Sequence, residues 1–489
     1  MGRVIKQTIW NSVSAYLGVV LGAINTLVLY PWAFKDNPEY LGLVNLLLSY
    51  ALVVSTFGQL GAPNIMVRFF PAYSEKGKQQ LFGFGVLLPL AGIALFALAM
   101  FFFKVPIFNW LTDDPLVLKY SFVLLPLVVF NIYFEVFSSI SQSYIRTVYP
   151  MFLKEVVRRV MATVLLVMYF FDLVDFWWFM VLFTVSYALQ FAMLIQFLQK
   201  NNYLKFGWGI SDLNQKKLLD YGLFVFLIAG GNLLIGRIDM IMIAKYAPEA
   251  LVSVAKYSIA FFMASVINTP NKSLIAIARP LLSKAWEEND MDQIKKIYSS
   301  SCLNQLIFAG IIFLIIWSSI SDIFHILPEK FRGGEMAFLY LGIARVYSMA
   351  TGANSLIIAA TSHYRFNLTS NIILIVSAII MNMWLIPIYG LEGAAIATLF
   401  SFIVDNSVKV IYIWIKLKIQ PFNRQALITV AVLAATFALG YVLPNVGNAF
   451  VNIMFKSTVI GLFYAVIVYK LQLSAEVNGI VSNFLKKFT

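Results

Sequence analysis

The sequence predicts an all-helical membrane protein that crosses the bilayer many times. Three observations support this fold class. Of the 489 residues, 61% are hydrophobic and only 12% are charged, the mean hydropathy is +0.82, and apolar runs of about 20 residues recur along almost the whole chain. A helix of that length crosses a hydrocarbon core of about 30 Å and satisfies its own backbone hydrogen bonds there, so a bundle of spanning helices is expected.

About fourteen apolar segments are long enough to span. The first runs from about residue 9 to 34 and has no small-residue cleavage site, so it predicts a spanning helix and not a signal peptide. The eighth is interrupted by Pro270 and Asn271, which permit a bend. The segments are centred near Val20, Tyr50, Ala91, Val129, Val164, Leu189, Ala229, Ala264, Ile311, Ala350, Ala378, Phe402, Val432 and Ile460.

The placement of Lys and Arg predicts the orientation. If the N-terminus is cytoplasmic, the loops on that side hold about 24 basic residues and those on the other side about 7, which is a strong positive-inside bias. An even number of helices then leaves both termini in the cytoplasm. The net charge of +13 is thereby explained by membrane topology, and no nucleic-acid partner is expected.

The helices are expected to form two lobes of six, followed by two more helices. The predicted boundaries are residues 1–216, 217–420 and 421–489. A hint of internal duplication supports the lobes, because Ala62-Pro63-Asn64 after the second helix is similar to Thr269-Pro270-Asn271 in the eighth. Duplicated lobes are common in membrane transporters.

The sequence contains no signs of enzyme or metal chemistry. We find no nucleophile elbow, P-loop or zinc-protease motif. Cys302 is the only cysteine, and His325 and His363 are the only histidines, which is too few for a cysteine or histidine metal centre. No loop exceeds roughly 20 residues, so none can hold a soluble catalytic domain. We therefore expect a protein that is not an enzyme and has no cofactor.

Charges inside the predicted spans are the strongest functional signal. A charge at bilayer depth is costly, and it usually faces a cavity or a partner and marks a pathway. Most of these charges are basic, which indicates an anionic ligand, and guanidinium and ammonium groups suit phosphate. The five basic residues are Arg237, Lys272, Arg345, Lys409 and Lys456.

Two of these bases lie close in sequence to an acid. Arg237 and Asp239 are two positions apart in the seventh predicted helix, so they are expected to point about 200° from each other. Asp405 and Lys409 are spaced i,i+4 in the twelfth, with the acid first, which favours an ion pair. That pair is either structural or part of a binding site. Arg68, at the inner end of the second helix, either guards an entrance or anchors the helix.

The remaining intramembrane charges lead to separate expectations. Arg345, in the tenth helix, is expected to line a cavity. Lys272 either lines the same cavity or extends to the cytoplasmic face, while Lys456, near the outer end of the last helix, is expected to extend its ammonium to water. Glu135, in the fourth helix, has Arg146 as its expected partner.

Three sequence runs resemble one family. Residues 382–398 read NMWLIPIYGLEGAAIAT, residues 236–239 read GRID and are followed at 254–260 by VAKYSIA, and residues 331–334 read FRGG. Together they resemble the polysaccharide transporter family, whose members are bacterial flippases for lipid-linked oligosaccharides. This family belongs to a superfamily with the MATE drug exporters and the lipid II flippase. Ala255 departs from the glycine that is usual at its position.

The resemblance implies a fold and a function. It implies two six-helix lobes in a V around a central cavity that opens alternately to each side of the bacterial inner membrane. The implied substrate is a polyprenyl-pyrophosphate-linked oligosaccharide for O-antigen or exopolysaccharide export, driven by H⁺ or Na⁺. A polysaccharide polymerase and chain-length proteins are the expected partners. The candidate substrate-binding residues are Arg68, Arg237, Lys272, Arg345 and Lys409, and the candidates for charge balance or ion coupling are Glu135, Asp239 and Asp405.

Three alternative functions stay open. A MATE-like exporter of drugs or metabolites would favour cations and is expected to have an acidic cavity. A lipid II flippase would carry a cargo of the same chemical kind. A membrane enzyme such as a polysaccharide polymerase or ligase is expected to have a large outer loop with catalytic charges, and the sequence has no such loop.

Overall fold

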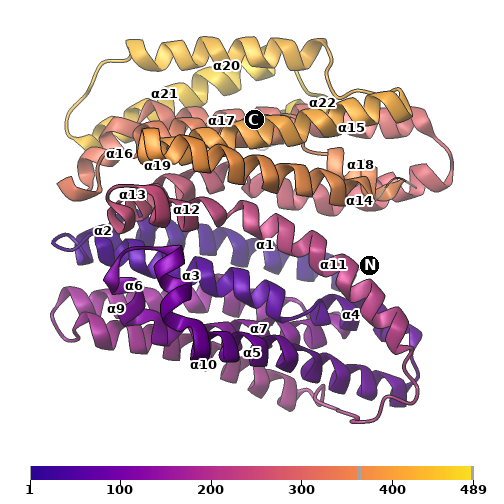
Figure 1. Ribbon diagram of the computed structural model, residues 1–489. Helices are drawn as coiled ribbons and strands as arrows, with labels where there is room; N and C mark the ends of the chain where they lie inside the picture. Colours follow the sequence, from indigo (N-terminus) through magenta and orange to yellow (C-terminus); the bar gives the residue numbers. More distant parts are fainter. Residues whose placement is uncertain (1, 362, 364, 486–489) are drawn as a thin grey trace. The chain divides into compact units, whose positions relative to one another are not determined.

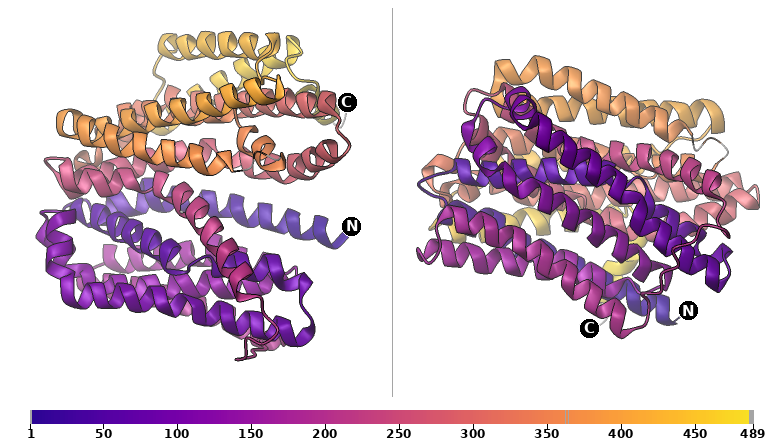
Figure 2. Two further views of the ribbon diagram at one scale, coloured as in Figure 1. Left: turned by 45° about the vertical axis from the view of Figure 1, so that its right-hand side comes forward. Right: turned by 60° about the horizontal axis from the view of Figure 1, so that its bottom comes forward.

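The computed structural model of the protein describes residues 2–361, 363 and 365–485. Within these ranges the chain forms helices and no β-strand, as Figures 1 and 2 show. The prediction of an all-helical membrane fold is confirmed. Backbone contacts divide the chain into two compact units, Met1–Ala255 (unit 1) and Lys256–Thr489 (unit 2).

Unit 1 is built from helices of very different lengths. Its α-helices are α1 (Gly2–Ala23), α2 (Tyr30–Ala33), α3 (Glu39–Gly58), α4 (Ala62–Phe69), α5 (Glu75–Leu111), α6 (Pro115–Tyr120), α7 (Leu124–Ser143), α8 (Val148–Phe152), α9 (Arg158–Phe170), α10 (Phe176–Lys200), α11 (Gln215–Ile235) and α12 (Ile238–Tyr246). They are joined by the π-helices η1 (Ile24–Leu29) and η4 (Leu153–Val157) and the 3₁₀ turns η2 (Phe70–Ala72) and η3 (Ser121–Val123). At the centre, α7 packs against α3, α4, α5 and α10.

The boundary between the units falls within α13 (Ala250–Ile267). The later helices are α14 (Thr269–Glu287), α15 (Met291–Ser318), α16 (Ile320–Ile326), α17 (Glu335–Ala350), α18 (Asn354–Ala360), α19 (Phe366–Leu417), α20 (Arg424–Val442), α21 (Ala449–Lys470) and α22 (Ala475–Leu485), with the 3₁₀ turn η5 (Glu329–Phe331). In unit 2, α15 packs against α14, α17, α20 and α21, and α17 packs against α19.

The unit boundary differs from the predicted lobe boundary at residue 216. Helix α11 contacts α3 and α4, and α12 contacts α3 and α5. These contacts group both helices with unit 1, whereas the sequence assigned them to the second lobe, residues 217–420. The lobes of six helices, and the separate pair in residues 421–489, stay a prediction.

Ten helices within the described residues are long and apolar enough to span a membrane. The predicted number of fourteen is not established by this criterion. It passes over the helical segments that a π-helix or a break divides, at η4, between α11 and α12, and between α17 and α18. It also takes α19 as one helix, although the backbone leaves helical geometry at Gly390.

The family-like run of residues 382–398 forms the turn inside α19. Gly390 has φ 57° and ψ −132°, a conformation that residues with a Cβ rarely adopt. A Cβ on Gly393 would lie 2.2 Å from the carbonyl oxygen of Leu385. Both glycines are therefore required where the two halves of α19 meet, and this local need explains the glycines in the run.

Side-chain caps mark where several long helices begin. Ser74 accepts a hydrogen bond from the backbone N–H of Gly77 at 3.3 Å, and Asp175 accepts one from Trp178 at 2.8 Å. Such caps satisfy N–H groups that have no partner within the helix. They set the starts of α5 and α10.

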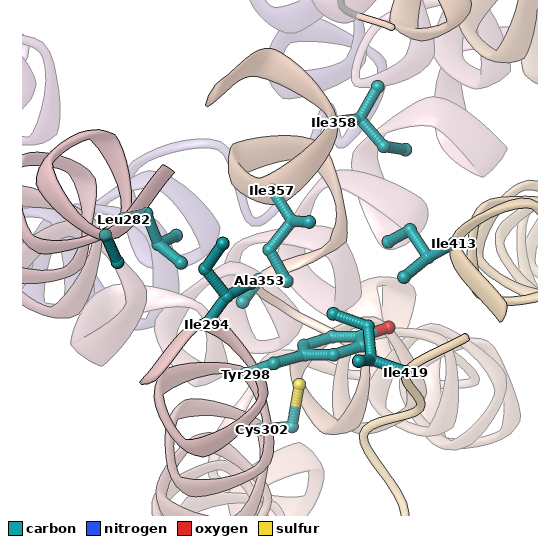
Figure 3. Close-up of a cluster of buried hydrophobic side chains, with 10 residues drawn as sticks. Leu282, Ile294, Tyr298, Cys302, Ala353, Ile357, Ile358, Ile413 and Ile419 are labelled. Carbon is teal, nitrogen blue, oxygen red and sulfur yellow. The ribbon is translucent and has the colours of Figure 1, made fainter. Parts of the chain in front are cut away.

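The core of unit 2 includes a cluster where α14, α15, α18 and α19 meet (Figure 3). Tyr298 and Cys302 lie one turn apart on α15 within this cluster, and the Tyr298 hydroxyl hydrogen-bonds the side-chain oxygen of Asn354. Cys302 is buried. This agrees with its interpretation as a small core residue.

Gly61 provides a test of the packing in unit 1. Its φ is 76°, and a Cβ there would lie 2.5 Å from the carbonyl oxygen of Gly222. We expect Gly61→Ala to lower the free energy of unfolding by about 1–3 kcal/mol through strain and overpacking. The thermal unfolding midpoint of the purified protein measures this. Gly461→Ala is the control, because its nearest neighbouring atom is 3.6 Å away. An equal midpoint for both variants would contradict the packing account.

Candidate functional site

A polar cavity of about 550 Å³ lies inside unit 1. Its walls come from α3, α4, α7, η4, the start of α9 and the break between α11 and α12. The polar lining residues are Ser55, Thr56, Gln59, Asn64, Asn131, Glu135, Ser139, Gln142, Lys154, Arg158 and Arg237. Such a concentration of polar side chains in an apolar bundle is the feature expected of a site or pathway.

The π-helix η4 supplies two of the three basic residues. Lys154 lies within η4, and Arg158 follows at the start of α9. Insertions of this kind widen one helical turn and are frequent at functional sites. The helix therefore continues through Val148–Phe170 while it presents Lys154 and Arg158 to the cavity.

Lys154 forms an ion pair with Glu135 on α7. The ammonium nitrogen lies 2.5 Å from the carboxylate Oε1, and the two side chains are 41% and 39% exposed. The expected partner of Glu135 was Arg146, so this prediction is replaced by Lys154. At this exposure the pair contributes little to stability, and its position on the cavity wall is its more informative feature.

Arg237 reaches the cavity from a helix break. The chain turns at Gly236 and Arg237, and Arg237 is the N-cap residue of α12, with φ −129°. The prediction of one continuous helix with Arg237 and Asp239 about 200° apart is therefore wrong, because that geometry requires an unbroken helix. Asp239 is buried in the first turn of α12, where a carboxylate is favoured by the helix dipole.

The charges of the cavity wall favour an anion. Lys154, Arg158 and Arg237 face one acid, Glu135. The Arg158 guanidinium also lies 5.7 Å from the ring centre of Tyr187, a cation–π contact that limits its freedom. Two guanidinium groups offer planar donor pairs that match phosphate or carboxylate oxygens.

The other predicted site residues of unit 1 lie elsewhere. Arg68 is exposed on α4, and its guanidinium carbon lies 5.3 Å from the ring centre of Tyr221 on α11. It does not line the cavity. Of the eight candidates, Arg237 and Glu135 are the two that the cavity brings together.

In unit 2, Asp405 and Lys409 form the ion pair that their spacing favours. The Lys409 ammonium lies 2.7 Å from Asp405 Oδ2, with side chains only 7% and 5% exposed, and the Ser370 hydroxyl donates to the other carboxylate oxygen. Arg345 is half-buried, with its guanidinium carbon 5.0 Å from the ring centre of Phe402. Lys272 lies in α14, but its side chain is outside the described residues.

Sequence reasoning missed Lys154 and Arg158. Both were counted among the basic residues of a cytoplasmic loop. The signal that they are different is their place inside a run that stays helical from residue 148, two turns before the centre of the fifth predicted span. A π-helix cannot be read from hydropathy, so its effect on side-chain direction was not predictable.

Solved structures with the same fold are membrane transporters. The chain is similar to the lipid II flippase MurJ in an inward closed conformation, with TM-score 0.76, 15% identity, and 96% of this chain and 100% of that chain covered. It is also similar to a multidrug resistance MATE family transporter of the MOP superfamily in an inward-facing conformation, with TM-score 0.62, 14% identity, and 81% and 94% covered. For a Vibrio cholerae MATE transporter, VcmN, the values are 0.58, 14%, 86% and 98%.

The fold therefore defines the class of the protein. It is a multi-pass membrane protein with the fold shared by the lipid II flippase and the MATE transporters. No protein-family model and no curated protein matches the chain. The narrower resemblance to polysaccharide transporters rests on the three sequence runs given above.

Proposed function

We propose that the protein is a flippase that moves a polyprenyl-pyrophosphate-linked oligosaccharide across the bacterial inner membrane, with both termini in the cytoplasm. It would serve the export of O-antigen or exopolysaccharide, together with a polymerase and chain-length proteins. The observation that carries the proposal is the cavity in unit 1, where Lys154, Arg158 and Arg237 meet a single acid. A pyrophosphate carries the charge and the oxygen geometry that this wall binds best.

In this proposal the cavity binds the pyrophosphate and the prenyl tail stays in lipid. The guanidinium groups of Arg158 and Arg237 bind the phosphate oxygens, and Lys154 exchanges Glu135 for the substrate. The lobes then alternate in access, as transporters with repeated lobes do. Arg68, Lys272, Arg345 and Lys409 are proposed as further contacts for the anion, and Asp239 and Asp405, with Glu135, as the groups that balance charge or couple transport to H⁺ or Na⁺.

A second candidate is a MATE-like exporter of drugs or metabolites. The fold supports it, because MATE transporters are among the similar structures. The charge of the cavity argues against it, since a cation would be repelled by three basic groups facing one acid. A lipid II flippase is the other alternative, and its cargo would suit the same basic wall.

Gene deletion tests these alternatives in cells. We expect the deletion strain to lose surface polysaccharide, to recover it with the plasmid-borne gene, and to keep wild-type susceptibility to a panel of cationic drugs. Increased susceptibility with normal polysaccharide would favour the exporter. Loss of viability, with depletion blocking peptidoglycan synthesis, would favour lipid II as cargo.

Glu135 is expected to compete with the substrate for Lys154. We predict that Glu135→Gln strengthens binding of inorganic pyrophosphate about threefold, because one negative charge leaves the wall and the partly exposed Lys154 becomes available. Isothermal titration calorimetry of the purified protein in nanodiscs measures the affinity. Glu287→Gln, an exposed acid on α14, is the matched control and should bind as the wild type does. Unchanged or weaker binding by Glu135→Gln would contradict the assigned competition.

A further inference from the structure

A second cavity, of about 400 Å³, lies inside unit 2, away from the basic cavity of unit 1. It is found where α15 and α20 end and α17 begins, on the side that the charge bias predicts to be the outer face. Its volume is within the range of ~300–1,000 Å³ that is usual for ligand pockets. The helices α20 and α21 that form part of it belong to residues 421–489, outside the predicted lobes.

One wall of this cavity is aromatic. The rings of Trp317 on α15 and Phe437 on α20 are almost parallel, at 5°, with centres 6.0 Å apart. Tyr441 follows one turn later, with its ring 5.4 Å from that of Phe437, and it is 68% exposed. These three side chains give a flat apolar surface with one accessible edge.

The opposite wall is a hydrogen-bonded network with no excess positive charge. The Lys456 ammonium lies 3.3 Å from Asp322 Oδ2 and 2.8 Å from Asn445 Oδ1. Asn452 donates to the same two oxygens, at 2.7 Å and 3.0 Å. The expectation that Lys456 extends to water is therefore wrong: the residue is 8% exposed and its charge is neutralised by Asp322.

Polar capacity is left over for a ligand. Lys456 has three donors, of which this network uses two, and the amide nitrogen of Asn445 has no printed-distance partner within the described part of the chain. Glu335, in the first turn of α17, also lines the cavity, where the helix dipole favours its charge. With Lys456 already paired and Glu335 acidic, this cavity disfavours phosphate.

We propose that this cavity binds the ring of a neutral sugar. A hexose has a C–H face that stacks on flat aromatic surfaces, and hydroxyl groups that both donate and accept hydrogen bonds. The aromatic wall suits the first feature, and Glu335, Asn445 and Lys456 suit the second. The ring can belong to a soluble glycan or to a glycolipid head group at the membrane surface. The inference does not depend on the flippase proposal, because it concerns binding alone.

Saturation-transfer NMR tests the proposal directly. The full-length protein in nanodiscs free of glycoside detergent is mixed with maltotriose as the probe. We expect saturation transfer to the sugar ring protons, and a signal weakened roughly fivefold in Tyr441→Ala, because the stacking surface loses its accessible ring. Phe450→Ala removes a similarly exposed aromatic residue of α21 outside the cavity and should leave the signal unchanged. The thermal unfolding midpoint confirms that both variants are folded.

Two further arms fix the source and the charge of the ligand. If nanodiscs containing monoglucosyl diacylglycerol suppress the maltotriose signal, the site takes glycolipid head groups; if the signal persists, it takes soluble glycan, and both results support a neutral sugar site. Inorganic pyrophosphate is expected not to compete. Absence of saturation transfer, equal signals from Tyr441→Ala and Phe450→Ala, or displacement by pyrophosphate would each overturn the proposal.

Discussion

Replacing Arg237 with glutamate is expected to reduce polysaccharide export roughly a hundredfold, because a partly buried contact to a charged ligand becomes a repulsion. Arg237 lies at the break between α11 and α12 and shares the cavity wall with Arg158 and Lys154. Charge reversal at Arg158 should have a similar effect. Because an arginine fork binds phosphate oxygens in pairs, Arg237→Lys should keep the charge and lose part of the activity.

The measurement is surface polysaccharide in a deletion strain that carries each variant, normalised to the amount of protein in the membrane. Lys295→Glu reverses an exposed charge at the start of α15 and should export normally. Arg345→Glu is expected to lose export in the same way if its proposed role in unit 2 holds. Wild-type export by Arg237→Glu and Arg345→Glu, at normal protein levels, would refute both assignments.

The largest effect on stability is expected from Lys409→Met. The Lys409–Asp405 pair is almost completely buried, at 7% and 5% side-chain exposure, and removing one partner leaves a buried charge alone. Breaking such a pair costs about 3–5 kcal/mol. We therefore expect a strongly lowered unfolding midpoint for the purified single variant.

The double variant Asp405→Asn, Lys409→Met should recover most of that stability. It removes both charges, and asparagine can still accept the hydrogen bond that Ser370 donates. Thermal unfolding of the wild type, the single variant and the double variant gives the comparison. Equal stability of the single variant and the wild type would show that the pair does not hold α19. If Lys409 also binds the anion, as proposed, the stable double variant should export poorly.

The sequence predicts the fold class well because hydropathy is a physical requirement of the bilayer and not a matter of detailed packing. The interruption at Pro270 is confirmed, since α13 ends at Ile267 and α14 begins at Thr269. The i,i+4 pair of Asp405 and Lys409 also forms as predicted, because both residues lie on an unbroken part of α19.

The candidate site was harder to predict, because it depends on departures from regular helix. The break at Arg237 and the π-helix at Lys154 both change where a side chain points, and neither leaves a trace in hydropathy. Counting bases by side of the membrane also assigned Lys154 to water, although it pairs with Glu135 on the cavity wall. Lys456 was misjudged for a similar reason, since its partner Asp322 is 134 residues away in the chain.

Transport by the purified protein tests the central claim most directly. Proteoliposomes are prepared with a fluorescent polyprenyl-pyrophosphate-linked oligosaccharide, and a membrane-impermeant quencher reports how fast the inner-leaflet lipid reaches the outside. A parallel set of vesicles reports uptake of a cationic dye under the same H⁺ or Na⁺ gradient. The account predicts fast exposure of the lipid by the wild type, little exposure by Arg237→Glu, and no dye transport. Dye transport without exposure of the lipid would contradict it.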